Sequence, residues 1–557
     1  MNPRLIVLII GGYGTFGSRV AKLLQHDPRL TLIIAGRSLK KATDFCQAHP
    51  NAAATLLPAA FDRNGDAAAQ LRAWSINYVI DASGPFQAYG DHPYRIVQAC
   101  ISQNINYIDL ADDSQFVIGI AQFDTAAQRA GCSILSGASS FPALSAAAVR
   151  HLATDMVQVK SICAGVAPSP DAPVGENVVR AIASYAGQPI TITRPSKIVF
   201  PFTEQKRFTI APPGYLPLPS ILFSLVDVPD LHIFPALWPD SEIIWTGAGP
   251  VPAFLHRILI ALAWLVRIRV LPTLTPLAWL MHAILKYRRW GEDRGGMIVE
   301  VTGIDRSGQS LRRSWHLVAE GQHGPFIPAM AAAALINRTL DQQPPRPGAR
   351  AAIRDLDLSD YQPIFTKHSI RTGIRDHDRK GNSGLYEHLL GSAYSLLPSA
   401  LQAMHHQPTT TSGRASIRRG KNPLAWLLAS IVGFPTAADD IPVQVRFEVT
   451  PNGEIWTRTF GAQSFSSHQF AGQGRNAGLL CERFGPMIFA MALVTQNNGL
   501  AFVLRRWSIG RLSLPLWLAP RSRSQESVEN GRFCFDVELS HPCTGLIVAY
   551  RGQLDPA

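Results

Sequence analysis

The chain has 557 residues, more than the roughly 250–300 at which one hydrophobic core stops growing, so several domains are expected. Hydrophobic residues make up 46% and charged residues 17%, a balance that excludes a generally disordered chain. The net charge of +12 suits a phosphorylated cofactor or an anionic membrane surface. No basic cluster has the pattern of a nucleic-acid-binding motif, so no nucleic-acid partner is expected.

The first predicted element is a buried parallel strand over residues 5–10, an unbroken apolar run. It leads into a glycine turn and then into the helical spacing of residues 18–24. The turn reads Gly11, Gly12, Tyr13, Gly14, Thr15, Phe16, Gly17. Glycines at this spacing permit a tight turn, let the backbone approach a pyrophosphate and let helix and strand pack closely. The turn therefore predicts a dinucleotide site.

The second predicted strand, residues 30–35, ends without the acidic residue that binds the ribose 2′-hydroxyl of NAD. Gly36, Arg37 and Ser38 follow instead, with Lys40 and Lys41 close behind. An arginine there can pair with a 2′-phosphate, which a carboxylate would repel. NADP(H) is the predicted cofactor.

Three later segments read as strand ends at the same sheet edge. The first, residues 79–86, is a fourth strand whose loop carries Ser83 and Gly84, followed by a helix from about His92 to Ile101. The others are residues 106–113 and 132–140. Because the nicotinamide lies at this edge in doubly wound folds, we expect Ser83 and Gly84 to contact the cofactor. Residues 1–150 are predicted to form a Rossmann-type doubly wound parallel sheet in an α/β domain.

Residues 151–345 are predicted to form a second, α+β substrate domain containing a long apolar stretch at 254–290. Arg267, Arg269, Pro272 and Pro276 divide that stretch, so two short helices are expected and not a membrane span. They would be buried or line a greasy substrate pocket, the interpretation we favour, or lie on a membrane face. The apolar composition favours an apolar substrate.

The polar, turn-rich segment 346–383 is predicted to be a linker. The remainder, 384–557, is predicted to be a β-rich (α+β) domain that opens with a helix at Leu385. Its alternating strands suggest a curved antiparallel sheet or barrel, which would hold an apolar ligand or serve as structural support.

Several motifs together resemble the saccharopine dehydrogenase-like NADP-binding oxidoreductases over about residues 1–345. They are the turn 11–17, residues 35–38, 81–86, 107–112 and 137–142, and residues 295–297 and 313–317 of the second domain. The resemblance implies NADP binding by the glycine turn and Arg37, with the cofactor across Ser83 and Gly84. Residues 482–486, 531–533 and 541–542 resemble an uncharacterised domain fused behind such reductases in bacteria.

The family's substrates range from saccharopine to lipid-like enoyl compounds, so the resemblance leaves the substrate open. We expect hydride transfer to a carbonyl, imine or enoyl group of a small apolar substrate. The candidate proton donors are Asp112, Asp113, Tyr89 and His92, each within reach of the predicted nicotinamide edge. The alternatives are a saccharopine-type amino acid dehydrogenase and a non-catalytic NADPH-sensing protein with a lipid- or membrane-contacting surface.

The seven scattered cysteines contain no C-x-x-C pair, so neither a disulfide framework nor a metal site is predicted. No signal peptide is predicted at the N-terminus. The expected location is the cytoplasm, with peripheral membrane contact through 254–290 and a homodimer left open.

Overall fold

The computed structural model describes residues 4–170, 172, 175–250, 252–286, 292–377, 384–406 and 408–555. The chain divides into two compact units. The first holds Met1–Lys206, Leu222–Arg312 and Ala319–Arg371, and the second holds Arg207–Ile221, Arg313–Val318 and Thr372–Ala557.

The first unit contains a seven-stranded parallel sheet in the order β15-β6-β5-β4-β1-β2-β3. Its strands are β1 (Leu5–Ile10), β2 (Leu30–Gly36), β3 (Thr55–Ala60), β4 (Tyr78–Asp81), β5 (Asn106–Asp109), β6 (Ser133–Ser136) and β15 (Gly348–Ala351). The strand order reverses between β1 and β4, which is where open α/β sheets bind ligands at their carboxyl edge. The predicted Rossmann-type doubly wound sheet is confirmed.

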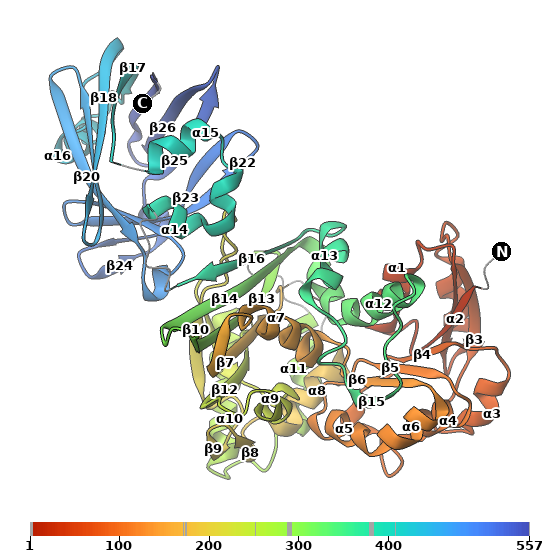
Figure 1. The fold of residues 1–557 in the computed structure, drawn as a ribbon. Helices are drawn as coiled ribbons and strands as arrows, with labels where there is room; N and C mark the ends of the chain where they lie inside the picture. The colour runs from red at the N-terminus through yellow and green to blue at the C-terminus, as the bar shows by residue number, and fades with distance from the viewer. Residues whose placement is uncertain are drawn as a thin grey trace. The chain divides into compact units, whose positions relative to one another are not determined.

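Helices cover this sheet on both faces (Figure 1). They are α1 (Gly17–Leu24), α2 (Leu39–Gln47), α3 (Ala67–Arg72), α4 (Arg95–Ser102), α5 (Ser114–Gly119), α6 (Asp124–Ala130) and α12 (Ile327–Leu340). Helix α7 (Ser145–Leu152) packs on β13 (Arg294–Asp305) of a second sheet. The apolar run at 5–10 needed this double cover, and Val7 and Ile9 are wholly buried. The helix expected from about His92 begins at Arg95.

The predicted linker at 346–383 is wrong over its described part. Its residues form β15, which pairs with β6, then α13 (Leu358–Thr366) and β16 (Ile370–Asp376). Residues 378–383 lie outside the described residues. The segment β15 is only four residues long and reads Gly-Ala-Arg-Ala, so its sequence lacks the apolar run that signals a buried strand. Its place comes from pairing with the edge of the sheet.

A second, mixed seven-stranded sheet has the order β10-β11-β12-β7-β13-β14-β16. Its further strands are β7 (Met156–Ala167), β10 (Gln205–Phe208), β11 (Ile221–Leu225), β12 (Ile243–Ala248), β13 (Arg294–Asp305) and β14 (Ser310–Glu320). Strand β7 pairs parallel with β12 and antiparallel with β13. Around it lie α8 (Glu176–Tyr185), the hairpin β8 (Ile190–Thr193) and β9 (Ser196–Val199), and α9 (Asp230–Leu237). The predicted α+β architecture is confirmed.

The apolar stretch divides, as predicted, into two helices, α10 (Ala253–Arg267) and α11 (Ala278–Lys286). None of the described helices is long and apolar enough to cross a membrane. The favoured interpretation, that these helices are buried, is wrong for their outward faces, since ten large apolar side chains between Phe254 and Leu285 are exposed. The reason is that α10 packs only one side on the domain, where His256, Ala263 and Val266 are buried.

The second unit contains an antiparallel sheet in the order β22-β21-β20-β19-β18-β17-β27-β26-β25-β23-β24, and a further β22–β23 pairing closes it into a barrel. Its strands are β17 (Thr410–Arg419), β18 (Ala438–Thr450), β19 (Gly453–Phe460), β20 (Gln463–Ala471), β21 (Leu480–Phe484), β22 (Met487–Gln496), β23 (Gly499–Ile509), β24 (Leu512–Leu514), β25 (Arg521–Glu529), β26 (Arg532–His541) and β27 (Gly545–Leu554). Three helices accompany them: α14 (Leu385–Leu390), α15 (Ser399–His406) and α16 (Pro423–Val432). The β-rich prediction is confirmed.

Candidate functional site

The glycine turn between β1 and α1 is held where only glycine fits. Gly11 has a φ of +73°, and a Cβ built on it would lie 2.8 Å from the carbonyl oxygen of Ala82. A Cβ on Gly17 would overlap the carbonyl oxygen of Gly11. The turn therefore packs directly against the chain that follows β4, with α1 beginning at Gly17. This is a backbone cradle at a helix N-terminus, the arrangement that binds phosphate groups.

The end of β2 lies beside the turn because the Tyr13 side chain reaches it. The Tyr13 hydroxyl accepts a hydrogen bond from the Ser38 backbone N–H at 2.9 Å. A Cβ on Gly36 would lie 2.6 Å from that hydroxyl, so glycine is required there. Ser38 then caps α2, its Oγ accepting the Lys41 backbone N–H at 3.3 Å. Arg37, the residue predicted to bind a 2′-phosphate, is exposed at this edge.

No acidic side chain accompanies Arg37 in this part of the sequence. From Leu30 the first carboxylate along the chain is Asp44, near the middle of α2. Lys40 and Lys41 are exposed in the first turn of that helix. The local charge is therefore positive, which suits a phosphate and disfavours the acidic contact that NAD enzymes make.

The loop after β4 is organised by the buried carboxylate of Asp81. Its Oδ1 accepts hydrogen bonds from the Ser83 backbone N–H at 3.0 Å and the Ser83 Oγ at 2.6 Å. Its Oδ2 accepts the Tyr89 hydroxyl at 3.1 Å. The Arg63 guanidinium lies 3.2 Å from the centre of the Tyr89 ring. This network orients Ser83 at the edge where the nicotinamide is expected.

Tyr89, one of the predicted proton donors, is buried in that network. Burial and the neighbouring Asp81 carboxylate raise the pKa of Tyr89. Its hydroxyl is engaged by both Asp81 and Ser83, with 2.9 Å to the Ser83 Oγ. Through these hydrogen bonds Tyr89 holds the loop after β4 in place. Its role as a donor stays a prediction.

A second buried carboxylate, Asp109, lies at the end of β5. Its Oδ1 accepts the backbone N–H groups of Ala111 at 2.9 Å and Gly137 at 2.8 Å, and the Ser136 hydroxyl at 3.0 Å. Among the described residues nothing hydrogen-bonds its buried Oδ2. Burial raises the pKa of Asp109 to about 7. A carboxyl group that titrates near neutrality is typical of functional sites.

The acidic candidates Asp112 and Asp113 follow in the next loop. Asp112 is exposed and its Oδ1 accepts the Gln87 side-chain amide at 3.2 Å. Asp113 caps α5, its Oδ1 accepting the Phe116 backbone N–H at 2.7 Å. Desolvation raises the pKa of the half-buried Asp113 carboxyl, and the nearby charge of Asp227 adds to that rise. His92, the fourth candidate, is exposed.

The structure brings one group to this loop that the sequence reasoning missed. The Ser114 hydroxyl donates to Asp227 Oδ1 at 3.0 Å, and His232 Nε2 lies 3.1 Å from the same oxygen. Asp227 and His232 belong to the α+β layer, more than a hundred residues further along the chain. Asp227 lies in the loop before α9 and His232 in the first turn of that helix, and neither belongs to a motif, so residue type was their only sequence signal.

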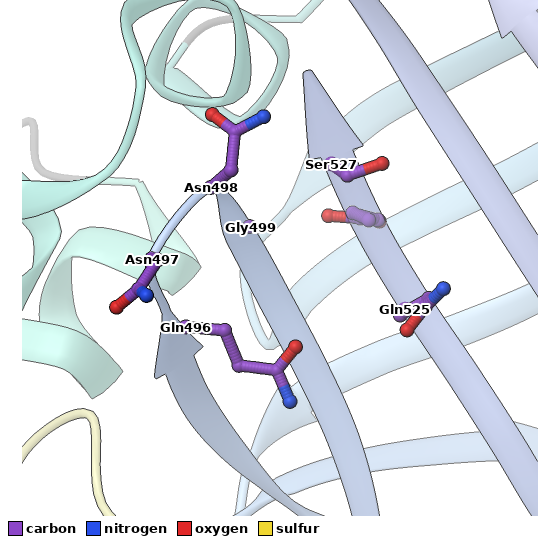
Figure 2. A pocket seen from close by; sticks show the side chains of 7 residues that line it. Gln496, Asn497, Asn498, Gly499, Gln525 and Ser527 are labelled. Atoms are coloured by element: carbon purple, nitrogen blue, oxygen red, sulfur yellow. The ribbon is translucent and has the colours of Figure 1, made fainter. Parts of the chain in front are cut away.

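The barrel carries a separate depression of about 460 Å³ at the β22–β23 turn (Figure 2). Its lining is polar and consists of Gln496, Asn497, Asn498, Gly499, Gln525, Glu526 and Ser527. Glu526 also accepts a hydrogen bond from His405 Nε2 at 2.7 Å. Such a lining differs from that of the apolar ligand site suggested for this domain.

The parallel sheet, its switch point and the glycine cradle together define a Rossmann-type dinucleotide-binding protein. Residues 7–154 match the family model described as saccharopine dehydrogenase NADP binding domain. Residues 397–554 match a second model, domain of unknown function (DUF4166). The chain therefore joins a saccharopine dehydrogenase-type nucleotide-binding domain to this C-terminal domain. Its class is that of an NAD(P)-dependent oxidoreductase.

Solved structures with a similar arrangement include saccharopine dehydrogenase (L-Glu forming) from Saccharomyces cerevisiae. It has 13% identity and a TM-score of 0.48, with 67% of this chain and 99% of that chain covered. Biliverdin reductase from Synechocystis sp. PCC 6803, in complex with biliverdin and NADP+, has 12% identity and a TM-score of 0.30, covering 62% and 93%. At such values the likeness carries no information on substrate. Curated proteins gave no match.

Proposed function

We propose that this chain is an NADP-dependent oxidoreductase that transfers hydride between the nicotinamide and a carbonyl, imine or enoyl group of a small apolar substrate. The observation that carries the choice of NADP is the positive end of β2, where Arg37 is exposed and no carboxylate precedes Asp44. The glycine cradle fits the cofactor, since Cβ atoms on Gly11 and Gly17 would meet backbone atoms and force the turn out of the tight conformation that lets a backbone approach a pyrophosphate. When bound, the cofactor supplies the hydride.

Each part of the site has a binding task. Backbone N–H groups of the turn 11–17 and the N-terminus of α1 bind the pyrophosphate. Arg37 pairs with the 2′-phosphate, and Tyr13 holds its loop against the turn through Ser38. Ser83 and Gly84 lie at the nicotinamide end, oriented by Asp81. The predicted cofactor residues thus form one continuous edge from the 2′-phosphate to the nicotinamide.

We expect residues in or beside the loop after β5 to transfer the proton. Asp112 and Asp113 lie there, and the pair formed by His232 and Asp227 contacts it through Ser114. A histidine oriented by a carboxylate is a common general acid or base. His232 therefore joins Asp112, Asp113, Tyr89 and His92 as a candidate donor. That the substrate is apolar stays a prediction from the composition of residues 254–290, because many large apolar side chains of that stretch are exposed.

The first experiment is a titration of the full chain with NADPH and with NADH, followed by nicotinamide fluorescence. We expect tighter binding of NADPH. Arg37→Ala should weaken NADPH binding by about 10- to 100-fold, the worth of a charge-assisted hydrogen bond, and leave NADH binding nearly unchanged.

Arg72→Ala is the matched control, since Arg72 is exposed in the last turn of α3 and belongs to no part of the cradle. Equal affinity of the wild type for the two cofactors would overturn the choice of NADP. Oxidation of bound NADPH by aldehydes, imines or enoyl thioesters then tests catalysis. NADPH binding without oxidation by any of them would favour the alternative of a nucleotide-sensing protein.

A further inference from the structure

Most of the exposed large apolar side chains in the described part of the second unit gather at one end of the barrel. Neighbouring strands run antiparallel, so the connections between consecutive strands alternate between the two ends. One end contains α16, which joins β17 to β18, and the short 3-10 helix η8 (Leu516–Leu518), which joins β24 to β25. The exposed side chains at this apolar end are Leu424, Trp426, Leu427, Leu428 and Ile431 of α16, and Ile509, Leu512, Leu516, Trp517 and Leu518 of β23, β24 and η8.

Helix α16 turns its large side chains outward. Leu424, Leu427 and Ile431 recur at a spacing of three to four residues, which places them on one side of the helix, and they are 49–69% exposed. Ala425 and Ala429 on the opposite side are buried, where the helix packs on β27. Only small residues therefore face the barrel, and the large ones face solvent.

Contacts at both ends of α16 fix the side that faces solvent. Asn422 caps the helix, its Oδ1 accepting a first-turn backbone N–H at 2.9 Å. The Arg419 guanidinium donates to the Phe434 carbonyl oxygen, just beyond the helix, at 3.0 Å. A Cβ on Gly420 would overlap the carbonyl oxygen of Leu546, so the chain before α16 lies tightly against β27.

A series of contacts joins α16 to the second group of apolar side chains. Phe434, in the loop after α16, has its ring centre 6.4 Å from that of Phe484, which lies 6.2 Å from that of Phe489. Phe489 stacks on Trp507 with 6.2 Å between ring centres. The Trp507 Nε1 donates to the carbonyl oxygen of Pro515, directly before η8, at 2.9 Å. Both groups therefore belong to one continuously packed end of the barrel.

The connecting segments at this end carry positive charge only. Residues 420–437, 461–462, 485–486, 510–511, 515–520 and 542–544 contain Lys421 and Arg511 and no acidic residue. Both basic side chains are exposed. Of the two carboxylates near the start of β18, Asp440 pairs with Arg414 and Asp439 is exposed. An apolar surface with basic residues in its connections is complementary to an anionic interface.

We propose that the apolar end of the barrel binds the surface of a bilayer that contains anionic phospholipids. The aliphatic side chains enter the boundary between headgroups and acyl chains, where Trp426 and Trp517, 60% and 74% exposed, also lie. Lys421 and Arg511 bind the lipid phosphates. Helix α16 has 10 residues, too few to span, so the contact is peripheral. The surface belongs to the second unit, and its binding does not depend on the proposed nucleotide site.

Flotation of the purified full chain with vesicles tests this binding. We expect the chain to float with vesicles that contain phosphatidylglycerol and much less with vesicles of phosphatidylcholine alone. Leu427→Gln with Ile431→Gln should weaken vesicle binding by at least about tenfold through lost apolar burial. Trp517→Gln should weaken it by at least about fivefold, because η8 enters the same interface. Lys421→Gln with Arg511→Gln should weaken binding to anionic vesicles by about 30-fold at low salt.

Val449→Gln with Leu396→Gln is the matched control and should float like the wild type. The two side chains are 62% and 79% exposed in the same unit, and Val449 lies near the end of β18 that is far from α16. Urea denaturation of every variant checks that the barrel remains folded.

Failure of the wild type to float on anionic vesicles would overturn the proposal. Unchanged flotation of the Leu427 and Ile431 variant or of Trp517→Gln would do the same, as would an equal loss in the control. A dimer in sedimentation that the Leu427 and Ile431 variant dissociates, with neither protein bound to vesicles, would assign the apolar end to a second copy of the chain and reject the bilayer.

Discussion

Two regions of this molecule contain buried carboxylates, and the carboxylates are stabilised by different contacts in each. At the edge of the parallel sheet, Asp109 receives two backbone N–H groups and one hydroxyl but forms no ion pair among the described residues. Inside the barrel, Glu482 accepts the Arg458 guanidinium at 3.2 Å, the Ser467 hydroxyl at 2.6 Å and the Gln469 amide at 3.2 Å. The first arrangement leaves a proton to be exchanged near neutral pH, and the second holds its carboxylate in an ion pair.

This difference separates a site that can do chemistry from a structural network. A carboxyl whose pKa is raised to about 7 changes its charge under physiological conditions. The Glu482 carboxylate, paired with an arginine and hydrogen-bonded by Ser467 and Gln469, is part of the internal packing of the barrel. Burying a carboxylate costs free energy in both regions. Variants of each should show how the folded chain compensates for that cost, by protonation at Asp109 or by the ion pair at Glu482.

The first effect concerns the stability of the barrel. Arg458→Met leaves Glu482 largely buried without its cation and should lower the free energy of unfolding by about 3 kcal/mol. Urea denaturation followed by tryptophan fluorescence measures this loss.

Two further variants make this result specific. Arg458→Met with Glu482→Gln should regain part of the stability, because the unpaired charge is gone. Arg446→Met, which removes an exposed pair with Glu448, should cost less than about 1 kcal/mol. Equal losses for Arg458→Met and Arg446→Met would contradict a buried structural pair.

The second effect concerns pH at the sheet edge. The pKa of Asp109 rises from 3.8 to about 7 in the folded chain, so the folded state binds more protons than the unfolded state between these values. Its contribution to stability is therefore fully present below about pH 4 and is lost as the pH rises towards 7, by at most about 4 kcal/mol.

Asp109→Asn keeps an acceptor for the three donors and cannot titrate. It should flatten the change in stability between pH 4 and 7, measured by urea unfolding at a series of pH values. Some slope should remain, because burial also raises the pKa of Asp230 to about 7. Asp341→Asn, at an exposed carboxylate, is the control and should keep the full slope. An unchanged slope in Asp109→Asn would show that this carboxyl is ionised in the fold.

The smallest effect concerns the hydrogen bond between Tyr13 and Ser38, which holds the end of β2 beside the glycine turn. Tyr13→Phe removes the acceptor of the Ser38 backbone N–H and should weaken NADPH binding by about fivefold, the worth of one ordinary hydrogen bond. Fluorescence titration measures this change. NADH should be affected less, because the loop that Tyr13 holds carries the predicted 2′-phosphate contact. Equal weakening of both cofactors would assign Tyr13 to the turn as a whole.

Much of the proposed cofactor edge is visible in the sequence because its residues lie at fixed, short spacings. The apolar run before Gly11 and the basic residues after Gly36 can each be recognised from a few consecutive residues. Asp227 and His232 could not be predicted, since they approach Ser114 only through packing of separate layers. The division of the apolar stretch into α10 and α11 could be predicted from its prolines and arginines, but not which side of α10 packs on the domain.

The sequence by itself determined the glycine cradle, the absence of a carboxylate at the end of β2 and the alternation of the barrel strands, because these follow from neighbours along the chain. The tertiary structure decided that residues 348–351 complete the parallel sheet, that β22 pairs with β23 to close the barrel and that Asp109 is buried. Each of these depends on contacts between residues distant in sequence. Burial and pairing are properties of the assembled core, and no local pattern carries them.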